Sequence, residues 1–396
     1  MTNTAVILAG GIGSRLSPIT NFKHKSLVCI NNQPILELQI NQLLQLGIKK
    51  IIILTGHLHN QVEAFVVSKF SNEKENIFVL NSHPNFSPRD RLLKFRNEIG
   101  KKFILLYCDN FVEDSDLIKR LISTESPAVF LLNAREEGNI ELIDNCYAKY
   151  HDLKRSSTYK FVELGYLKIE CEDFFPLLSR SKTLNEAYET ITQENKCKFL
   201  ICNSQYISIS NLETYSNSTS NSKIILIDRD GVINHKMAPR EYVSQKSEFE
   251  YIDENIYALK TLSEEGFRFI VITNQPGVAT GAFEITFLET LHKQMVLDLL
   301  LQGIDIISVY TCTHHWDENC LCRKPKPGML LNAIQDFNIS PADTCYVGDE
   351  EKDQTAADLA GVESIIISST FKAKTIQFNT LTEAVPYIQN KFKRNI

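Results

Sequence analysis

Short apolar runs alternate with amphipathic helical stretches along most of this 396-residue chain. In the first half the apolar runs are AVILAG, KKIIILTG, NIFVLNS, KFILLYCD and PAVFLLNA, and they read as strands. Between them, residues 34–46 and 89–99 show helical periodicity. Strands that alternate with helices predict an α/β fold, in which a parallel sheet is covered by helices on both faces.

One polar segment interrupts this alternation. Residues 214–223, TYSNSTSNSK, lack apolar periodicity, and we expect a linker over residues 216–222. The alternation then resumes with the runs KIILID, FRFIVITN, DIISVYTC, TCYVGD and ESIIIS. The sequence therefore predicts two doubly wound parallel-sheet (Rossmann-like) domains, over residues 1–215 and 223–396.

Composition excludes several classes of partner. The chain has a net charge of −6, with 43% hydrophobic and 23% charged residues, so its overall field attracts neither nucleic acid nor an anionic membrane. No apolar run is long enough to span a membrane, and the start, MTNTAVILAGG, lacks the features of a secretion signal. We expect a cytoplasmic protein with neither nucleic acid nor membrane as a partner.

Polar side chains with related chemistry follow several strands of the second domain. Asp228 and Asp230 follow the strand KIILI in the motif DRDGVIN, a pattern that also suits a simple strand-ending turn. The motifs VITNQPG, CRKPKPG and YVGDEEKD end later strands and supply Thr273, Asn274, Arg323, Lys324 and Asp349. Because parallel strands present their carboxyl ends at one edge, this set predicts a site for a phosphate group and a divalent metal ion.

Three cysteines and two histidines cluster in CTHHWDENCLCRKPKPGM. The pairs Cys312/His314 and Cys320/Cys322 flank a short polar loop and offer the four ligands of a closed, tetrahedral Zn²⁺ site. Four protein ligands leave no open position, so the zinc is expected to be structural. The alternative is a loop of reduced cysteines without metal.

These motifs, in this order, resemble the haloacid dehalogenase-like phosphatases across essentially all of the second domain. The resemblance implies that Asp228 is the nucleophile that accepts the phosphoryl group, and that Asp230 is the general acid and base. It implies Mg²⁺ on Asp228, Asp349 and the main-chain carbonyl of Asp230, with Thr273 and Lys324 against the phosphoryl oxygens. Asp353 either supports this site or is a solvated residue of a helix's first turn.

The cysteine cluster next to RKPKPGM narrows the resemblance to D-glycero-D-manno-heptose 1,7-bisphosphate 7-phosphatases, with the related histidinol-phosphatases as the alternative. The resemblance implies substrate contacts from Asn274 and Arg323. The segment HKMAPREYV is two residues longer than in that branch, and it supplies approximate contacts from Arg240, Glu241 and Tyr242. Glu350 is a sixth expected substrate contact; it stands where the branch usually has lysine, which removes a cation that would meet the distal phosphate.

The first domain opens on a glycine-rich segment, LAGGIGSRLSPITNFKHKSL. Its glycines free the backbone to approach a polyphosphate, and its cations supply charge, although such a run can also be a tight turn. With the following residues it resembles the sugar-phosphate nucleotidyltransferases. The resemblance implies nucleotide contacts from Gly10, Gly11, Gly13, Arg15 and Lys25, a metal carboxylate at Asp109 and a sugar contact at Glu163.

This first domain also departs from that family. Ser208 stands where a second metal aspartate is usual, Ser26 replaces a proline, and NFSPRDRLLKF occupies the region of a stretch that normally lies along the nucleotide. Two interpretations follow: a nucleotidyltransferase, or a module that binds a nucleotide or sugar phosphate without catalysis. A phosphatase and a nucleotidyltransferase on one chain would perform consecutive steps towards a nucleotide-activated heptose.

Overall fold

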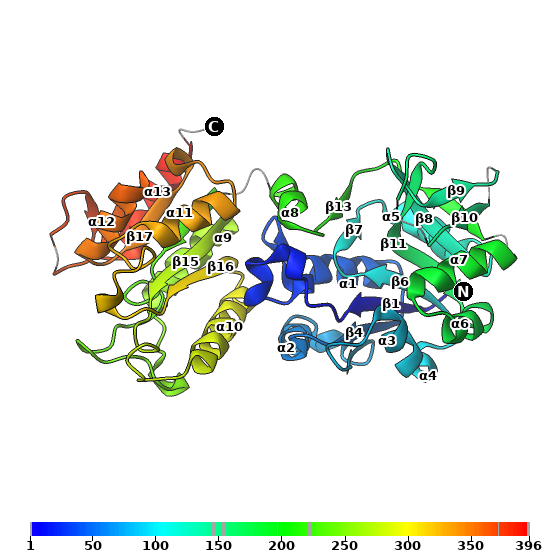
Figure 1. Cartoon of the computed structure of the whole chain (residues 1–396), viewed down its shortest axis with the longest axis horizontal. Helices are drawn as coiled ribbons and strands as arrows, with labels where there is room; N and C mark the ends of the chain where they lie inside the picture. Colours follow the sequence, from blue (N-terminus) through cyan, green and yellow to red (C-terminus); the bar gives the residue numbers. More distant parts are fainter. Residues whose placement is uncertain are drawn as a thin grey trace. The chain divides into compact units, whose positions relative to one another are not determined.

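The computed structural model describes residues 2–144, 147–152, 155–195, 197–219, 223–370 and 372–393. They form two compact units (Figure 1). Unit 1 comprises residues 1–14, 24–28 and 34–210, and unit 2 comprises residues 15–23, 29–33 and 211–396. None of the described helices is both long enough and apolar enough to cross a bilayer.

The main sheet of unit 1 runs in the order β10-β9-β11-β6-β1-β4-β5, with β8 and β12 branching from β11. Its strands are β1 (Thr4–Ala9), β4 (Lys50–Thr55), β5 (Ile77–Asn81), β6 (Lys102–Tyr107), β8 (Ala128–Ala134), β9 (Ile140–Leu142), β10 (Ala148–Tyr150), β11 (Phe161–Glu170) and β12 (Lys198–Ile201). A separate ribbon pairs β7 (Asn110–Val112) with β13 (Tyr206–Ser208), and another pairs β2 (Cys29–Ile30) with β3 (Gln33–Pro34).

The helices of unit 1 are α1 (Ile35–Gln45), α2 (His59–Lys69), α3 (Pro88–Lys94), α4 (Arg96–Ile99), α5 (Ser115–Ser123), α6 (Cys171–Arg180) and α7 (Leu184–Asn195). The five strands expected from the sequence are all present. The helix expected over residues 89–99 is instead divided into α3 and α4 at Phe95, whose backbone (φ −105°, ψ 24°) leaves the helical region while its ring packs into the core.

The sheet of unit 1 is mixed, which differs from the parallel sheet expected there. Strands β6, β1, β4 and β5 are parallel, whereas β11 runs antiparallel to both β6 and β8. The described chain between β8 and β11 contains no helix, and the crossover that a parallel neighbour needs is missing. The strand therefore returns in the opposite direction.

Unit 2 has a fully parallel sheet in the order β16-β15-β14-β17-β18-β19. Its strands are β14 (Lys223–Ile227), β15 (Phe267–Asn274), β16 (Ile306–Cys312), β17 (Cys345–Gly348), β18 (Glu363–Ile367) and β19 (Ile376–Phe378). Its helices are α8 (Leu212–Ser218), α9 (Asp253–Glu264), α10 (Ile285–Leu301), α11 (Gly328–Asp336), α12 (Glu351–Ala360) and α13 (Leu381–Lys393).

The expected linker falls partly on helix α8, which extends through residues 216–218, while residues 220–222 lie outside the described residues. Helix α8 forms although the segment lacks apolar periodicity, because Asn211 caps it through Thr214 and Tyr215 is buried. The domain boundaries near residues 215 and 223 remain a prediction.

The strand order of unit 2 indicates where a ligand would bind. The chain proceeds from β14 outwards to β15 and β16, then returns to β17 on the other side of β14. In open α/β sheets this reversal leaves a crevice at the carboxyl ends of the two central strands, where ligands bind. The buried apolar faces of β14, β15 and β17 form the core beneath it.

Candidate active site and metal sites

Two aspartates lie where the central strands of unit 2 end. Asp228 directly follows β14, and Asp349 directly follows β17. The amide of Asp228 donates to the carbonyl oxygen of Val347 at 2.8 Å. Gly231 has φ +88°, and a Cβ there would lie 2.1 Å from Asp349 Oδ2. Glycine therefore allows the turn after Asp228 to approach Asp349.

Lys324 supplies the opposite charge between two buried carboxylates. Its Nζ lies 2.7 Å from Asp228 Oδ2 and 2.8 Å from Asp353 Oδ1. The same ammonium group donates to Ile272 O at 3.0 Å and to Tyr346 Oη at 2.7 Å. The side chain is fully buried, so its direction is fixed by these four partners.

Asp353 is fully buried, so the solvated alternative for this residue is wrong. Its Oδ2 accepts the amides of Asp349 and Glu350, each at 3.1 Å. Its Oδ1 accepts from Lys324 and from Tyr346 Oη. Asp353 thus fixes the turn that carries Asp349 while it pairs with Lys324.

Burial and charge shift the pKa values in this group. Burial raises the pKa of Asp228 to about 7, although Lys324 acts in the opposite direction. Burial alone would lower the pKa of Lys324, but Asp228 and Asp353 raise it above its ordinary value, so the ammonium group stays charged.

Asp230 is held as a carboxylate by three donors. Arg229 Nη2 lies 2.8 Å from Asp230 Oδ1, Asn234 Nδ2 donates to the same oxygen at 2.9 Å, and Gln275 Nε2 donates to Oδ2 at 2.7 Å. Burial raises the pKa of Asp230, but Arg229 and the hydrogen bonds outweigh it and lower the pKa overall. Gln275 also donates to Thr273 Oγ1 at 2.8 Å, which joins Thr273 to this group.

The carboxylates fit a hard divalent cation. One oxygen each of Asp228, Asp349 and Asp353 lie within 4.8 Å of one another, and Asp349 Oδ1 is buried without a hydrogen-bond partner. The oxygens of Asp228 and Asp353 already accept from Lys324 and from backbone amides, so Asp349 Oδ1 is the carboxylate oxygen of this group that is left open for a metal ion. An ion such as Mg²⁺ prefers oxygen ligands of this kind.

All six residues expected to contact substrate line one cavity of about 290 Å³, together with Asp230; they are Asn274, Arg323, Arg240, Glu241, Tyr242 and Glu350. Sequence reasoning missed Lys236, Lys352 and Trp316, which line the same cavity. Lys236 contacts both Asp349 and Glu350, and Lys352 also pairs with Glu350. Lys236 and Lys352 therefore supply positive charge beside Glu350, where the sequence had indicated that a cation was lost.

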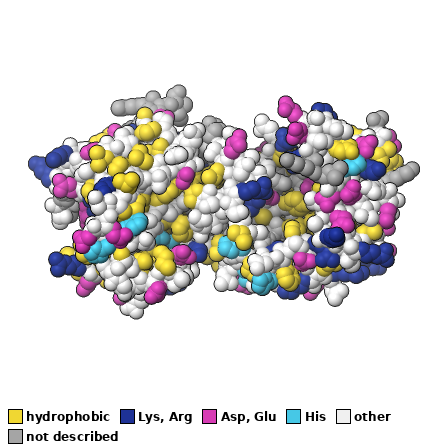
Figure 2. All heavy atoms as spheres, viewed as in Figure 1, with side chains coloured by type: hydrophobic (Ala, Val, Ile, Leu, Met, Phe, Trp, Pro, Cys, Tyr) yellow, Lys and Arg dark blue, Asp and Glu magenta, His cyan; other side chains and the backbone are white. Residues whose placement is uncertain are grey.

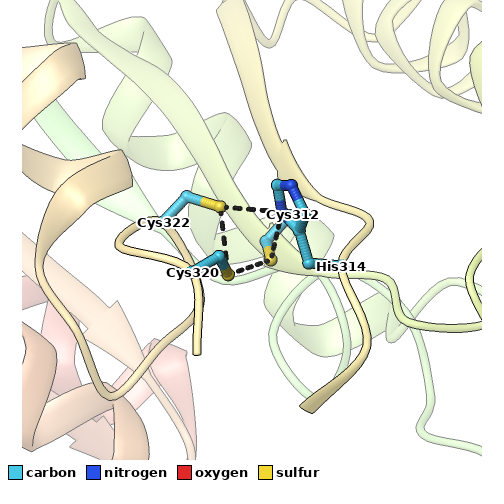
Figure 3. Close-up of side chains that lie close together, drawn as sticks. All are labelled: Cys312, His314, Cys320 and Cys322. Carbon is cyan, nitrogen blue, oxygen red and sulfur yellow. Dashed lines mark hydrogen bonds between the residues drawn. The ribbon is translucent and has the colours of Figure 1, made fainter. Parts of the chain in front are cut away.

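The cysteine cluster forms a second candidate metal site, drawn in Figure 3. Cys312 Sγ lies 3.7 Å from Cys320 Sγ and 3.7 Å from His314 Nδ1. Cys322 Sγ lies 3.5 Å from Cys320 Sγ and 3.2 Å from His314 Nδ1. Tetrahedral Zn–S bonds of about 2.3 Å place neighbouring sulfurs about 3.8 Å apart, so this spacing suits a single central ion.

In unit 1 the glycine-rich loop after β1 borders a cavity of about 390 Å³. Five of the expected nucleotide residues line it: Gly10, Gly11, Gly13, Lys25 and Asp109. Lys25 Nζ pairs with Asp109 Oδ2. Arg15 is exposed and belongs to the segment grouped with unit 2.

Arg91, which the sequence did not single out, fixes this loop. Its guanidinium donates to Gly10 O at 2.8 Å, to Pro84 O at 2.9 Å and to the carbonyls of His83 and Phe86. A Cβ on Gly10 would lie 1.9 Å from Arg91 Nε. The glycine therefore makes room for a buried cation as well as for a turn.

Two further positions test the expected nucleotide site. Glu163 lies on β11 outside the residues that line the cavity, and burial raises its pKa to about 7. Ser208 pairs with Asn110 across β13 and β7, and Ile209 donates to Asp109 O at 2.8 Å. Ser208 thus lies beside the Asp109 strand end, but it brings no second carboxylate.

Lys324→Met should destabilise unit 2 by about 3–5 kcal/mol, because it leaves two buried carboxylates without their counter-charge. Urea unfolding followed by the emission of Trp316, the single tryptophan, measures this change. The exposed Lys260→Met serves as the matched control, with an expected effect within about 0.5 kcal/mol. Equal stability of the two variants would contradict the account.

Comparison with known proteins finds matches in both parts of the chain. A family model described as nucleotidyl transferase matches residues 4–125, and one described as haloacid dehalogenase-like hydrolase matches residues 177–367. The D-glycero-beta-D-manno-heptose-1,7-bisphosphate 7-phosphatase of Pasteurella multocida is 38% identical over 160 residues, which cover 39% of this chain and 85% of the relative. The enzyme of that name from Haemophilus ducreyi is 35% identical over 181 residues, 42% of this chain and 98% of the relative. The chain therefore belongs, through its haloacid dehalogenase-like part, to the D-glycero-beta-D-manno-heptose-1,7-bisphosphate 7-phosphatase family.

Proposed function

We propose that unit 2 removes the 7-phosphate of D-glycero-beta-D-manno-heptose 1,7-bisphosphate. The observation that carries this proposal is the group Asp228, Asp349, Lys324 and Asp353 at one edge of the sheet, next to the cavity that Asp230 lines. Family membership supports the choice of substrate. A histidinol-phosphatase or another small phosphate-ester phosphatase is the alternative, and competition of the heptose bisphosphate against histidinol phosphate and other small phosphate esters separates them.

The geometry suggests a two-step reaction. A carboxylate oxygen of Asp228 attacks phosphorus, the bond to the sugar oxygen breaks, and an aspartyl-phosphate forms. Asp230, a carboxylate in the free site, would take up the proton of the substrate's phosphate monoanion and pass it to the leaving sugar oxygen; it would then take a proton from the water that hydrolyses the aspartyl-phosphate. Lys324 and Thr273 neutralise and orient the phosphoryl oxygens. Bound at Asp228 and Asp349, Mg²⁺ would lower the charge barrier between the nucleophile and the phosphate.

The nucleophile assignment predicts that Asp228→Asn lowers phosphatase turnover by on the order of 10⁴-fold or more, because an amide cannot form the acyl phosphate. Phosphate release from heptose 1,7-bisphosphate with Mg²⁺ measures the effect. Asp253→Asn, at an exposed carboxylate in the first turn of α9, is the matched control and should retain activity. Comparable turnover by both variants would refute the assignment.

For the cysteine cluster we propose a structural Zn²⁺ ion. The loop that holds the four ligands leads directly into Arg323 and Lys324, so the metal would fix the approach of these cations. The amide and carbonyl of Lys324 also bond the side chain of Asn274, at 3.1 and 3.0 Å.

Elemental analysis should find about one zinc per chain, and Cys320→Ser should lose it, because three remaining ligands hold the ion less tightly. Cys171→Ser, at an isolated and half-buried cysteine of α6, should keep its zinc. Full zinc content in Cys320→Ser would contradict the assignment.

For unit 1 we propose a nucleotidyltransferase that couples heptose 1-phosphate to a nucleoside triphosphate. The support is the cavity that brings the glycine-rich loop, Lys25 and Asp109 together. Clusters of three or more metal-ligating side chains in the described ranges occur only in unit 2, and Ser208 leaves Asp109 without a carboxylate partner. A binding module without catalysis is therefore the second candidate.

Pyrophosphate release from GTP or CTP with heptose 1-phosphate decides between these candidates. An enzyme limited by its single carboxylate should gain activity and Mg²⁺ affinity in Ser208→Asp, because two carboxylates hold the ion more tightly than one. Ser71→Asp, an exposed serine elsewhere in unit 1, is the control. No pyrophosphate from either the wild type or Ser208→Asp would support the binding module.

The cellular location proposed for these activities is the cytoplasm. None of the nine cysteines described forms a disulfide, as a reducing compartment favours. On the face drawn in Figure 2, acidic, basic and hydrophobic side chains are interspersed.

Phosphorylated sugars and nucleotides are the partners that the two cavities suit. Surface-polysaccharide or lipopolysaccharide synthesis is the destination we propose for the product.

A further inference from the structure

The candidate zinc loop carries an aromatic side chain that the chemistry above does not use. Trp316 is the only tryptophan of the chain and is 54% exposed. It begins a short 3₁₀ turn, Trp316–Glu318, between the ligands His314 and Cys320. Single exposed apolar side chains are common on protein surfaces, so a role for Trp316 has to be argued from the residues around it.

Trp316 lines the substrate cavity of unit 2, together with Asp230 and Arg323. Half of the other residues that line this cavity are charged, a few are small or aliphatic, and Tyr242 is the only other aromatic among the described lining residues. Charged groups suit phosphate and hydroxyl groups, whereas the carbon–hydrogen face of a sugar ring needs an apolar surface. An indole ring offers the largest such surface of any side chain.

Local contacts hold the indole in place. Its ring lies against the ring of His315, with centroids 3.8 Å apart and the two planes tilted by 34°. The amide of His315 donates to Glu318 Oε1 at 2.6 Å, and the amide of Asp317 donates to His315 Nδ1 at 3.3 Å. Ligand pairs of the candidate zinc site lie on both sides of the turn. A side chain ordered before binding loses little entropy when a ligand packs on it.

We propose that Trp316 is a specificity-determining residue of the phosphatase, whose indole packs against the carbon–hydrogen face of the substrate's sugar ring. Phosphate groups of the same sugar phosphate are bound by the cations of the cavity. The zinc loop thereby selects sugar phosphates over phosphate esters that lack a ring. This inference rests on the phosphatase function proposed for unit 2.

A direct test uses the emission of Trp316 itself, since no other tryptophan contributes. In the Asp228→Asn variant, which does not turn substrate over, heptose 1,7-bisphosphate should change the emission saturably. Inorganic phosphate, which has no ring, should not. Heptose 1,7-bisphosphate that binds by calorimetry without changing the emission would overturn the proposal.

Kinetics provide the second test. Trp316→Ala should raise KM for heptose 1,7-bisphosphate about 10-fold or more, the usual effect of losing one apolar contact, with kcat nearly unchanged. Its KM for acetyl phosphate should not change, and Trp316→Phe should recover part of the loss. Leu321→Ala is the matched control, because Leu321 is 79% exposed on the same loop but does not line the cavity. Equal KM increases for both substrates, or an unchanged KM for the heptose, would overturn the proposal.

The same assays separate this inference from the proposed function. A wild-type enzyme that hydrolyses other sugar phosphates but not heptose 1,7-bisphosphate would refute the proposed substrate only. The Trp316 variants are then measured with the sugar phosphate that is hydrolysed, against acetyl phosphate. An enzyme that hydrolyses acetyl phosphate but no sugar phosphate would refute both proposals.

Discussion

The buried ammonium group of Lys324 between Asp228 and Asp353 is the interaction on which the site in unit 2 depends. Two carboxylates cannot stay charged in a buried position without a cation, and Lys324 provides it. Asp353 uses its second oxygen to fix the turn of Asp349. Lys324, which balances the charge of Asp228, is thus connected through Asp353 to Asp349, the residue that would bind the same metal ion as Asp228.

The sequence was informative about unit 2 because the sheet of this unit is parallel. Parallel strands bring their carboxyl ends together, so Asp228, Thr273 and Asp349 could be grouped from their positions after apolar runs. The pairs of metal-binding side chains at Cys312 and Cys320 were also visible, because their spacing is local. What the sequence could not provide was the direction of side chains from loops. Lys236 and Trp316 reach the cavity from loops whose paths no periodicity describes.

In unit 1 the sequence was less informative, for physical reasons that particular residues show. Gly10 was interpreted as a glycine that admits a polyphosphate, yet the space beside it also houses the guanidinium of Arg91. Arg91 lies far along the chain, and nothing in its spacing indicates that it reaches Gly10. The antiparallel course of β11 was missed because a buried strand has the same apolar pattern in either direction.

The two units differ in how complete their chemistry is. Unit 2 brings together the residues that we propose as nucleophile and general acid, with cations and with carboxylates that could hold a metal ion. Unit 1 has a glycine-rich loop, Lys25 and one carboxylate at Asp109, with Ser208 beside it. If both act, the product of the phosphatase is the sugar 1-phosphate that the nucleotidyltransferase consumes. That sequence of reactions gives a chemical reason for the fusion.

The central claim is that Asp228 carries the phosphoryl group of the sugar during turnover. Borohydride reduces an acyl phosphate to an alcohol, so quenching the enzyme with borohydride during hydrolysis of heptose 1,7-bisphosphate should convert Asp228 to homoserine. Peptide mass spectrometry then locates the modified residue. The account predicts homoserine at position 228, only when both Mg²⁺ and the heptose are present. Reduction at another residue, or none during measured turnover, would contradict it.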